Sequence, residues 1–282
     1  MIPAEFDYVR PGSIEEAAQA AGRPGAKVIA GGQSLLPLMK LRLARPSTIV
    51  DIGRIPGLTG TRYTDDGGAE MGAMTTYAQV IAETKLEWTR EALLNIGDVQ
   101  VRNRGTVGGA IAHADPAADV PAVSLALDYS AVLRSPRGER VVPLDGFFTG
   151  PFMTTAEPDE ILVAMRRGPL PDGAGGAYEK LAQPASGYAM VGVAVVVARS
   201  GGSISHARVG ITGVGEFPYR AKAVESALVG SDGSASAIAA AAAHATDGVT
   251  VNSDIHANAA YRSAMAVVHT RRAIETALGR SA

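Results

Sequence analysis

The sequence predicts an α+β protein of two domains, and three observations support this fold class. Short β-branched segments are interspersed with segments of helical periodicity along all 282 residues. A chain of this length suits two to three units that each bury a core. Proline and glycine concentrate in GPLPDGAGG, residues 168–176, which is the clearest linker. We therefore expect a first domain at 1–174, with subdomains 1–55 and 56–174, and a second at 175–282.

The first subdomain is predicted to begin with a helix. Ser13 is a candidate N-cap and Glu16 stands three positions on, which is the capping-box pattern before a helix at 14–21. An apolar strand then runs into a Gly-Gly pair and the helical segment SLLPLMKLRL, whose proline is tolerated within the first turn. The strands are expected at 27–30 and 48–52, and the second helix at 34–43.

The second subdomain is predicted to combine strands and helices around a long glycine-containing loop, VRNRGTVGGAIAHADPAAD. The alternating segment SAVLRSPRGERVVPL has turn residues Pro136 to Gly138 at its centre and predicts a β-hairpin. The other elements are expected as strands near 69–73 and 160–165, and as helices from about 76, at 89–96 and at 122–127.

The C-terminal domain is predicted to pair strands with alanine-rich helices. A valine-rich strand at 191–198 is followed by a turn and a second strand at 204–212. Three helical stretches come next. The segment 235–245 is read as a helix capped from Asp232 or Ser234.

Composition and charge exclude several classes of function. The formal net charge is −2 and no Lys/Arg block interleaves with aromatic residues, so nucleic-acid binding is not expected. The chain has no cysteine, so any iron–sulfur cluster must lie on a partner. His206, His244, His256 and His269 are scattered without carboxylates or cysteines at ligand spacing, and no metal site is expected.

No transmembrane segment is expected. The longest apolar run, 188–198, is shorter than the roughly 18 to 20 residues that cross a bilayer. The opening MIPAEFDYVRP has no apolar region after a basic start and does not read as a secretory signal. We therefore expect a cytoplasmic location.

The first candidate ligand site is AGGQS, residues 30–34, between a strand and a helix. Paired glycines let the backbone approach a ligand closely, so successive N–H groups can cradle a phosphate. Gln33 and Ser34 add side-chain donors. The motif matches neither the Rossmann nor the P-loop fingerprint. On this motif alone, a tight turn without a ligand remains the alternative.

The second candidate site is TVGGAIAHADPAAD, residues 106–119. Another Gly-Gly pair follows Thr106, and small residues then lead to Asp119. A dinucleotide carries two phosphates and ribose hydroxyls, so two glycine loops with Thr106 and Ser34 as donors and Asp119 as an acceptor fit such a ligand. The combination is more specific than either loop.

Together, AGGQSLLPLMKLRL and TVGGAIAHADPAAD resemble the FAD-binding medium subunit of the carbon monoxide dehydrogenase and xanthine dehydrogenase (molybdenum hydroxylase) family. The similarity covers nearly the whole chain, since FDYVRPGSIEEA, DIGRIPGL, QVRNRGTVGG and EKLAQPASGYAMVGVAV follow in the family's order. It implies a two-part FAD-binding domain of the vanillyl-alcohol-oxidase (PCMH) type and a small α+β C-terminal domain.

The resemblance implies non-covalent FAD binding and no catalytic residue on this chain. The first loop would bind the pyrophosphate and the second would face it. Asp119 would lie near the ribityl or ribose hydroxyls, and Lys180 would reach the cofactor. The implied cofactor-binding residues are Ala30, Gly31, Gly32, Gln33, Ser34, Leu35, Thr106, Gly108, Gly109, Ala110, Asp119, Leu162, Lys180 and Tyr188.

Three of the remaining assignments concern the flavin ring. The backbone of Leu162 would contact the isoalloxazine, and Tyr188 in SGYAMVG would approach it. For Tyr188 a core position is the alternative. For His113 a structural role is favoured over attachment of the cofactor.

The resemblance also implies a place in an electron-transfer complex. A molybdopterin large subunit would oxidise the substrate, and a [2Fe–2S] small subunit would pass electrons to FAD on this chain. An external acceptor would then receive them, and the expected assembly is a dimer of heterotrimers. Two alternatives stay open: a free-standing flavin oxidoreductase of the same fold, and a non-catalytic anion-binding assembly module. The substrate and the acceptor, whether quinone, NAD+ or oxygen, do not follow from the sequence.

Overall fold

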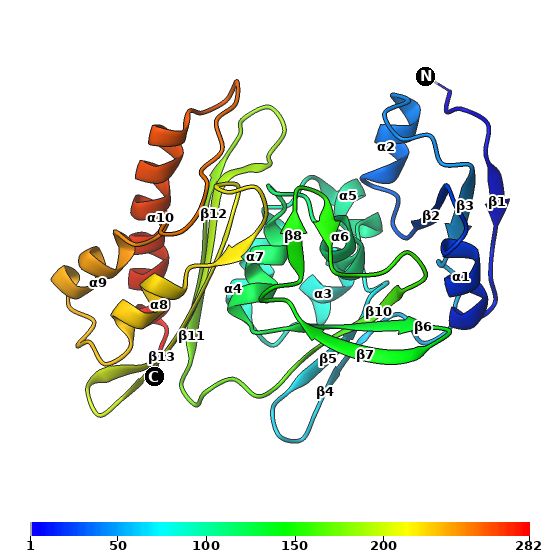
Figure 1. Cartoon of the computed structure of the whole chain (residues 1–282). Coiled ribbons are helices and arrows are strands. Elements are labelled where there is room, and N and C mark those ends of the chain that lie inside the picture. Colours follow the sequence, from blue (N-terminus) through cyan, green and yellow to red (C-terminus); the bar gives the residue numbers. More distant parts are fainter. Residues whose placement is uncertain (1) are drawn as a thin grey trace.

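The computed structural model describes residues 2–282, whose strands form sheets in three successive stretches of the chain (Figure 1). A three-stranded sheet comes first, a five-stranded sheet with a separate two-stranded one follows, and a four-stranded sheet comes last. The middle part lies between the other two (Figure 1). The predicted α+β class is confirmed, because each sheet is covered by helices of its own stretch or of a neighbouring one.

The N-terminal sheet is parallel. Its elements are β1 (Asp7–Val9), α1 (Ile14–Ala21), β2 (Ala26–Ile29), α2 (Leu35–Lys40) and β3 (Thr48–Asp51), with strand order β1-β3-β2. Helix α1 begins as predicted, because the Ser13 hydroxyl accepts the Glu16 N–H at 3.2 Å. The Glu16 carboxylate accepts the N–H of Gly12 at 2.8 Å, so the reciprocal bond differs from the predicted capping box by one residue.

The middle stretch is antiparallel. Its elements are β4 (Thr61–Tyr63), β5 (Ala69–Gly72), α3 (Tyr77–Glu83), α4 (Glu87–Leu94), α5 (Val99–Arg104), α6 (Val107–His113), α7 (Asp119–Ala126), β6 (Ser130–Ser135), β7 (Gly138–Pro143), β8 (Phe148–Gly150), β9 (Met153–Thr154) and β10 (Ile161–Arg167). The five-stranded order is β4-β5-β10-β6-β7. The predicted hairpin is confirmed as β6 and β7, which close at Ser135 opposite Gly138.

The predicted loop at 101–119 is wrong in part, because it contains most of α5 and all of α6. Both helices have side-chain caps. Asp98 accepts the N–H of Val101 at 2.8 Å, and Thr106 accepts the N–H of Gly109 at 3.1 Å. Two glycines in the first turn of α6 disfavour a helix by about 1 kcal/mol each, so local propensity did not indicate it.

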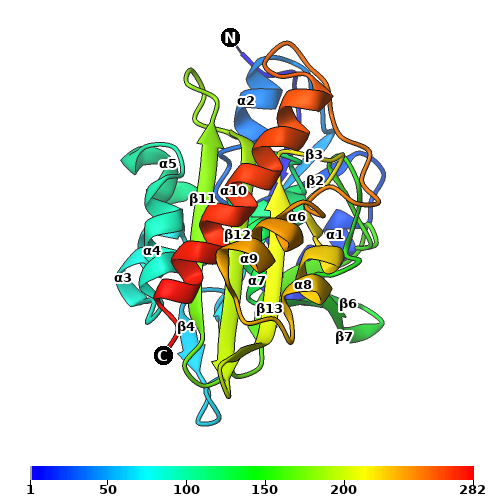
Figure 2. The same cartoon turned by 90° about the vertical axis from the view of Figure 1, so that its left-hand side faces the viewer.

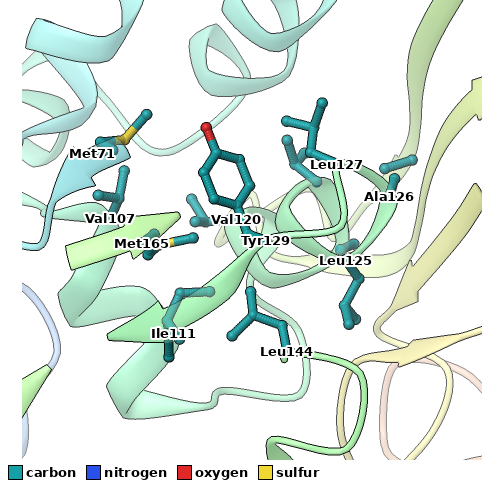
Figure 3. Close-up of a cluster of buried hydrophobic side chains, with 14 of the residues drawn as sticks. Met71, Val107, Ile111, Val120, Leu125, Ala126, Leu127, Tyr129, Leu144 and Met165 are labelled. Atoms are coloured by element: carbon teal, nitrogen blue, oxygen red, sulfur yellow. The ribbon is translucent and has the colours of Figure 1, made fainter. Parts of the chain in front are cut away.

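The core of the middle stretch consists mainly of aliphatic side chains (Figure 3). Tyr129 lies among them, close to Met71 and Met165, and is 7% exposed. Ile111 and Leu125 extend the same cluster toward α6 and α7. Burial of these side chains fixes both helices, and therefore the segment between them, against the sheet.

The C-terminal sheet is covered on both faces. Its stretch consists of β11 (Gly175–Ala182), β12 (Ala189–Ser200), β13 (Ser203–Thr212), β14 (Tyr219–Arg220), α8 (Lys222–Leu228), α9 (Ala235–Ala242) and α10 (Ala259–Gly279). Helices α8, α9 and α10 lie on one face, and α4 and α7 contact the other (Figures 1 and 2). The predicted valine-rich strand lies within β12, and Ser234 rather than Asp232 caps α9.

Candidate functional site

The first glycine loop, residues 30–34, connects the end of β2 to α2. Gly32 has a φ of +77°, a left-handed conformation that favours glycine. Among residues 2–282, the N–H groups of residues 31–34 find no acceptor. Ser34 precedes α2 without forming a side-chain cap bond. The loop therefore presents a row of free backbone donors and one hydroxyl.

The second glycine loop lies directly against the first. A Cβ atom at Gly31 would lie 1.9 Å from the carbonyl oxygen of Arg104, the last residue of α5 and two positions before the second loop, so the backbones of the two segments touch. A Cβ atom at Gly109 would lie 3.8 Å from the Cβ of Ala30. The structure thus brings both predicted loops, which are more than 70 positions apart, into one place.

The N–H groups of the second loop, unlike those of the first, mostly have acceptors within the protein. Thr106 is 4% exposed, and its carbonyl oxygen accepts the N–H of Ala110 at 3.0 Å. The N–H of Gly108 donates to the Ala73 carbonyl at 2.9 Å, and a Cβ there would lie 2.4 Å from the Cβ of Ala73. Gly108 therefore serves close packing of α6, whereas Gly109 faces the first loop.

A buried polar network lies at the start of α7. Asp119 is 5% exposed, and its carboxylate lies 2.9 Å from the Nζ of Lys180. Lys180 also donates to the carbonyl of Asn95 at 3.1 Å, and the Tyr178 hydroxyl donates to Asp119. Burial raises the pKa of Asp119, although Lys180 and Tyr178 act to lower it. The two charged residues predicted at the cofactor therefore hold each other in position.

Leu162 lies in β10 with a side chain that is 8% exposed. The strand has an irregularity between Leu162 and Ala164, and its pairing with β5 runs from Ala164 to Arg167. The backbone of Leu162 on the side facing β5 is thus outside the β5–β10 pairing. Any contact with a cofactor must use this backbone, because the side chain belongs to the core.

Tyr188 lines a cavity of about 340 Å³ and is 47% exposed, so it is not a core residue. Burial raises the pKa of its hydroxyl, and the charges of Asp115 and Asp119 raise it further. Asp115 lines the same cavity.

His113, the last residue of α6, packs against Phe152 with ring centroids 5.0 Å apart and ring planes tilted by 46°. Burial lowers the pKa of its imidazole.

Within residues 2–282, no three His, Cys, Asp or Glu side chains gather as a metal ion requires. In the same part of the chain, no helix combines the length and apolar content needed to cross a bilayer.

Two partners in the polar network were not predicted. Tyr178 stands two positions before Lys180 in β11, and the alternation of a strand places both side chains on one face. That spacing was a usable signal. Asn95 contributes a backbone carbonyl, which no residue type indicates.

Two family models match the chain in succession. Residues 4–166 match the FAD binding domain in molybdopterin dehydrogenase, and residues 176–277 match the CO dehydrogenase flavoprotein C-terminal domain. The carbon monoxide dehydrogenase medium chain of Hydrogenophaga pseudoflava is 41% identical and is covered over 100% of both chains. The 6-hydroxypseudooxynicotine dehydrogenase complex subunit alpha of Paenarthrobacter nicotinovorans is 38% identical, over 100% of this chain and 97% of that protein.

Solved structures agree with these relatives. A chain of carbon monoxide dehydrogenase from Hydrogenophaga pseudoflava superimposes with a TM-score of 0.96 at 43% identity, covering 100% of both chains. A chain of quinoline 2-oxidoreductase from Pseudomonas putida 86 gives a TM-score of 0.90 at 33% identity, covering 99% of each.

The fold and the matched models define an FAD-binding subunit of an oxidoreductase. More particularly, the chain belongs to the family of medium subunits of carbon monoxide dehydrogenase and related molybdenum hydroxylases. Members of this family are medium chains of multi-subunit complexes with small and large subunits. The predicted family, the FAD cofactor and the PCMH-type fold are thereby confirmed.

Proposed function

We propose that the chain binds FAD across its two glycine loops and relays electrons from a [2Fe–2S] partner subunit to an external acceptor. The carrying observation is the row of free N–H groups at residues 31–34. Adjacent N–H groups that converge form an anion site, and the pyrophosphate of FAD supplies the matching acceptor oxygens. Bound FAD supplies the redox chemistry.

The buried network would orient a positive charge toward the cofactor. Asp119 and the Asn95 carbonyl fix the ammonium group of Lys180, whose side chain is 7% exposed. A fixed cation in a buried site stabilises negative charge that arrives with electrons. Tyr178 holds the Asp119 carboxylate from the other side. We therefore assign Lys180 to charge stabilisation, and Asp119 and Tyr178 to its positioning.

Gly31→Ala tests the binding site. Its Cβ would meet the Arg104 carbonyl, so the loops must separate and FAD affinity should fall about tenfold or more. Gly168→Ala is the matched control, because a Cβ there meets nothing within 4 Å. FAD content is measured by visible absorption and acid release. Retention of FAD by Gly31→Ala, or a wild-type chain that ignores added FAD with its partners present, would refute the proposal.

The assembly is proposed in the same terms. A [2Fe–2S] small subunit and a molybdopterin large subunit would join this chain in a dimer of heterotrimers, which light scattering of the co-expressed complex would test.

The division of the chain into domains at residue 174, and of the first domain into subdomains at residue 55, also remains a proposal. It is supported by the sheets, each of which falls within one of the three stretches. A cytoplasmic location is proposed as well, and cell fractionation would test it.

A further inference from the structure

A second, smaller cavity of about 40 Å³ lies inside the core of the middle stretch. Side chains of β4, β5 and β10 line it on one side, and side chains of α3, α4 and α7 line it on the other. Met71, Tyr129 and Met165, three of its lining residues, lie together in Figure 3. A water molecule needs about 10 to 15 Å³ of such space, so this cavity can hold only a few atoms. It is named the Arg167 cavity after its one charged lining residue.

Arg167 occupies a position that the strand directs into the core. It is the last residue of β10, and the alternation of the strand places its side chain on the same face as that of Met165. That face packs against the helices of the middle stretch, and Arg167 is only 7% exposed. An arginine is almost never buried to this extent without a partner of opposite charge.

The protein itself provides no such partner. Within residues 2–282, Arg167 forms no ion pair with a carboxylate. Its Nη1 donates to the carbonyls of Gly67 at 3.3 Å and Gly168 at 2.8 Å, and its Cζ lies 6.0 Å from the centre of the Tyr129 ring. These groups hold the guanidinium in place but carry no net charge. The described lining of the cavity contains no Asp or Glu, so the positive charge is left uncompensated.

Two buried polar groups of the same lining also lack hydrogen bonds. The Nε of Arg167 and the Oγ1 of Thr89 have no partner within residues 2–282. Thr89 belongs to α4 and is 7% exposed, so it approaches the cavity from the wall opposite Arg167. Buried donors without acceptors are unfavourable, and in native proteins such groups usually bind an ordered water molecule or an ion.

Charge decides between the ligands that so small a space can hold. A water molecule would accept a hydrogen bond but would leave the buried guanidinium charge uncompensated. A halide ion is little larger than a water molecule, accepts hydrogen bonds from any direction and carries the missing negative charge. The apolar side chains of Met71, Val80 and Val123 in the lining suit an ion that is weakly hydrated.

We propose that the Arg167 cavity binds one monovalent anion of halide size, held by the Arg167 guanidinium and the Thr89 hydroxyl. The guanidinium already joins the turn between β4 and β5, through Gly67, to the start of the linker, through Gly168. A bound halide compensates the charge of this junction and fixes the guanidinium from the side of the cavity. Halide binding therefore stabilises the folded chain, and it requires no cofactor.

The first test is crystallographic. Crystals of the full-length chain soaked in sodium bromide should show an anomalous peak of bromine between Arg167 and Thr89. Crystals of Arg167→Met, which removes the charge but retains an unbranched side chain, should lack this peak. A water molecule in the cavity without an anomalous peak would overturn the proposal. A peak that Arg167→Met retains would mark an adventitious ion only and would overturn it as well.

Thermal unfolding in solution is the second test, and it decides the matter if Arg167→Met does not fold. The unfolding midpoint should rise with sodium chloride more than with sodium gluconate of equal ionic strength, because gluconate is too large for the cavity. Thr89→Val should weaken the apparent halide affinity about fivefold, the loss expected for one hydrogen bond. Thr270→Val is the matched control, because the Thr270 hydroxyl is also buried and without a partner but lies outside this lining. Equal midpoints in the two salts, or equal effects of the two valine variants, would refute the halide site.

Discussion

At the scale of single residues, Lys180 and Asp119 are a charged pair that the protein buries almost completely, with side chains 7% and 6% exposed. Burying two charges costs several kcal/mol each, and that cost is offset only when geometry and further hydrogen bonds are good. Tyr178 and the Asn95 carbonyl provide those bonds. Such an arrangement is poor evidence of added stability and better evidence of a group held ready for a ligand.

Removing one partner of this pair should be costly. Lys180→Ala leaves Asp119 buried without its cation and should lower the free energy of unfolding by about 3 to 5 kcal/mol. Lys222→Ala breaks the ion pair between Lys222 and Asp145. The Lys222 side chain is 66% exposed, so this change should lower the free energy of unfolding by less than about 1 kcal/mol. Urea denaturation of both variants measures the difference. Equal losses would show that the Asp119 site admits water freely.

At the scale of elements, an ion pair joins β7, an edge strand of the five-stranded sheet, to the start of β10, its central strand. Arg140 on β7 donates through Nε and Nη2 to the two carboxylate oxygens of Glu160, each at 2.6 Å, just before β10 begins. These bonds lower the pKa of Glu160 despite its partial burial. A carboxyl whose pKa is lowered on folding stabilises the protein where it is ionised.

The pH dependence of stability should reveal this pair. Its contribution is present above the unfolded pKa of about 4.3 and is lost as the pH falls through the lower folded pKa. The stability advantage of the wild type over Glu160→Gln should therefore be large at neutral pH and shrink toward pH 3. Glu139→Gln, in the solvent-exposed pair with Arg134, is the control. Urea titrations across the pH range measure both, and a constant advantage would contradict this assignment.

Elements with local signals were predictable and elements that depend on distant contacts were not. Ser13 and Ser234 mark the starts of α1 and α9, and both are observed caps. Helix α6 has a local cap at Thr106, but its two glycines weaken the helical signal, and its first turn is also held by a distant contact, the Gly108 N–H on the Ala73 carbonyl. The glycine loops could be found as motifs. The pairing of Asp119 with Lys180 could not, because 61 positions separate them.

At the scale of the whole molecule, the middle and C-terminal stretches share packing. Trp88 on α4 packs closely against β11, since a Cβ at Gly176 would lie 2.3 Å from its Nε1. Helix α7 contacts both β12 and β13. The core of the middle stretch accordingly includes Ala194 and Val196 of the C-terminal sheet. The cavity beside Tyr188 depends on this arrangement, because its walls come from both sides.

Truncation of Trp88 should weaken the packing between the middle and C-terminal stretches. Trp88→Ala should lower the free energy of unfolding by about 3 to 5 kcal/mol and expose the linker at 168–174 to proteases. Leu94→Ala, on the same helix but at a residue that is 50% exposed, should change stability by less than about 0.5 kcal/mol. Limited proteolysis with mass spectrometry locates the cleavage. Loss of stability without cleavage in the linker would confine the role of Trp88 to the middle core.

The backbone contact between Gly31 and Arg104 has a consequence for how the chain can vary. Residue 104 takes part through its backbone carbonyl, so the contact does not depend on which side chain stands there. Residue 31 must be glycine, because any Cβ would collide with that carbonyl. The contact itself orders the loop, so part of the entropy of ordering it is lost during folding rather than during binding. Affinity for the cofactor is then a property inherited from the fold, and sequences that keep the fold can diverge widely around it.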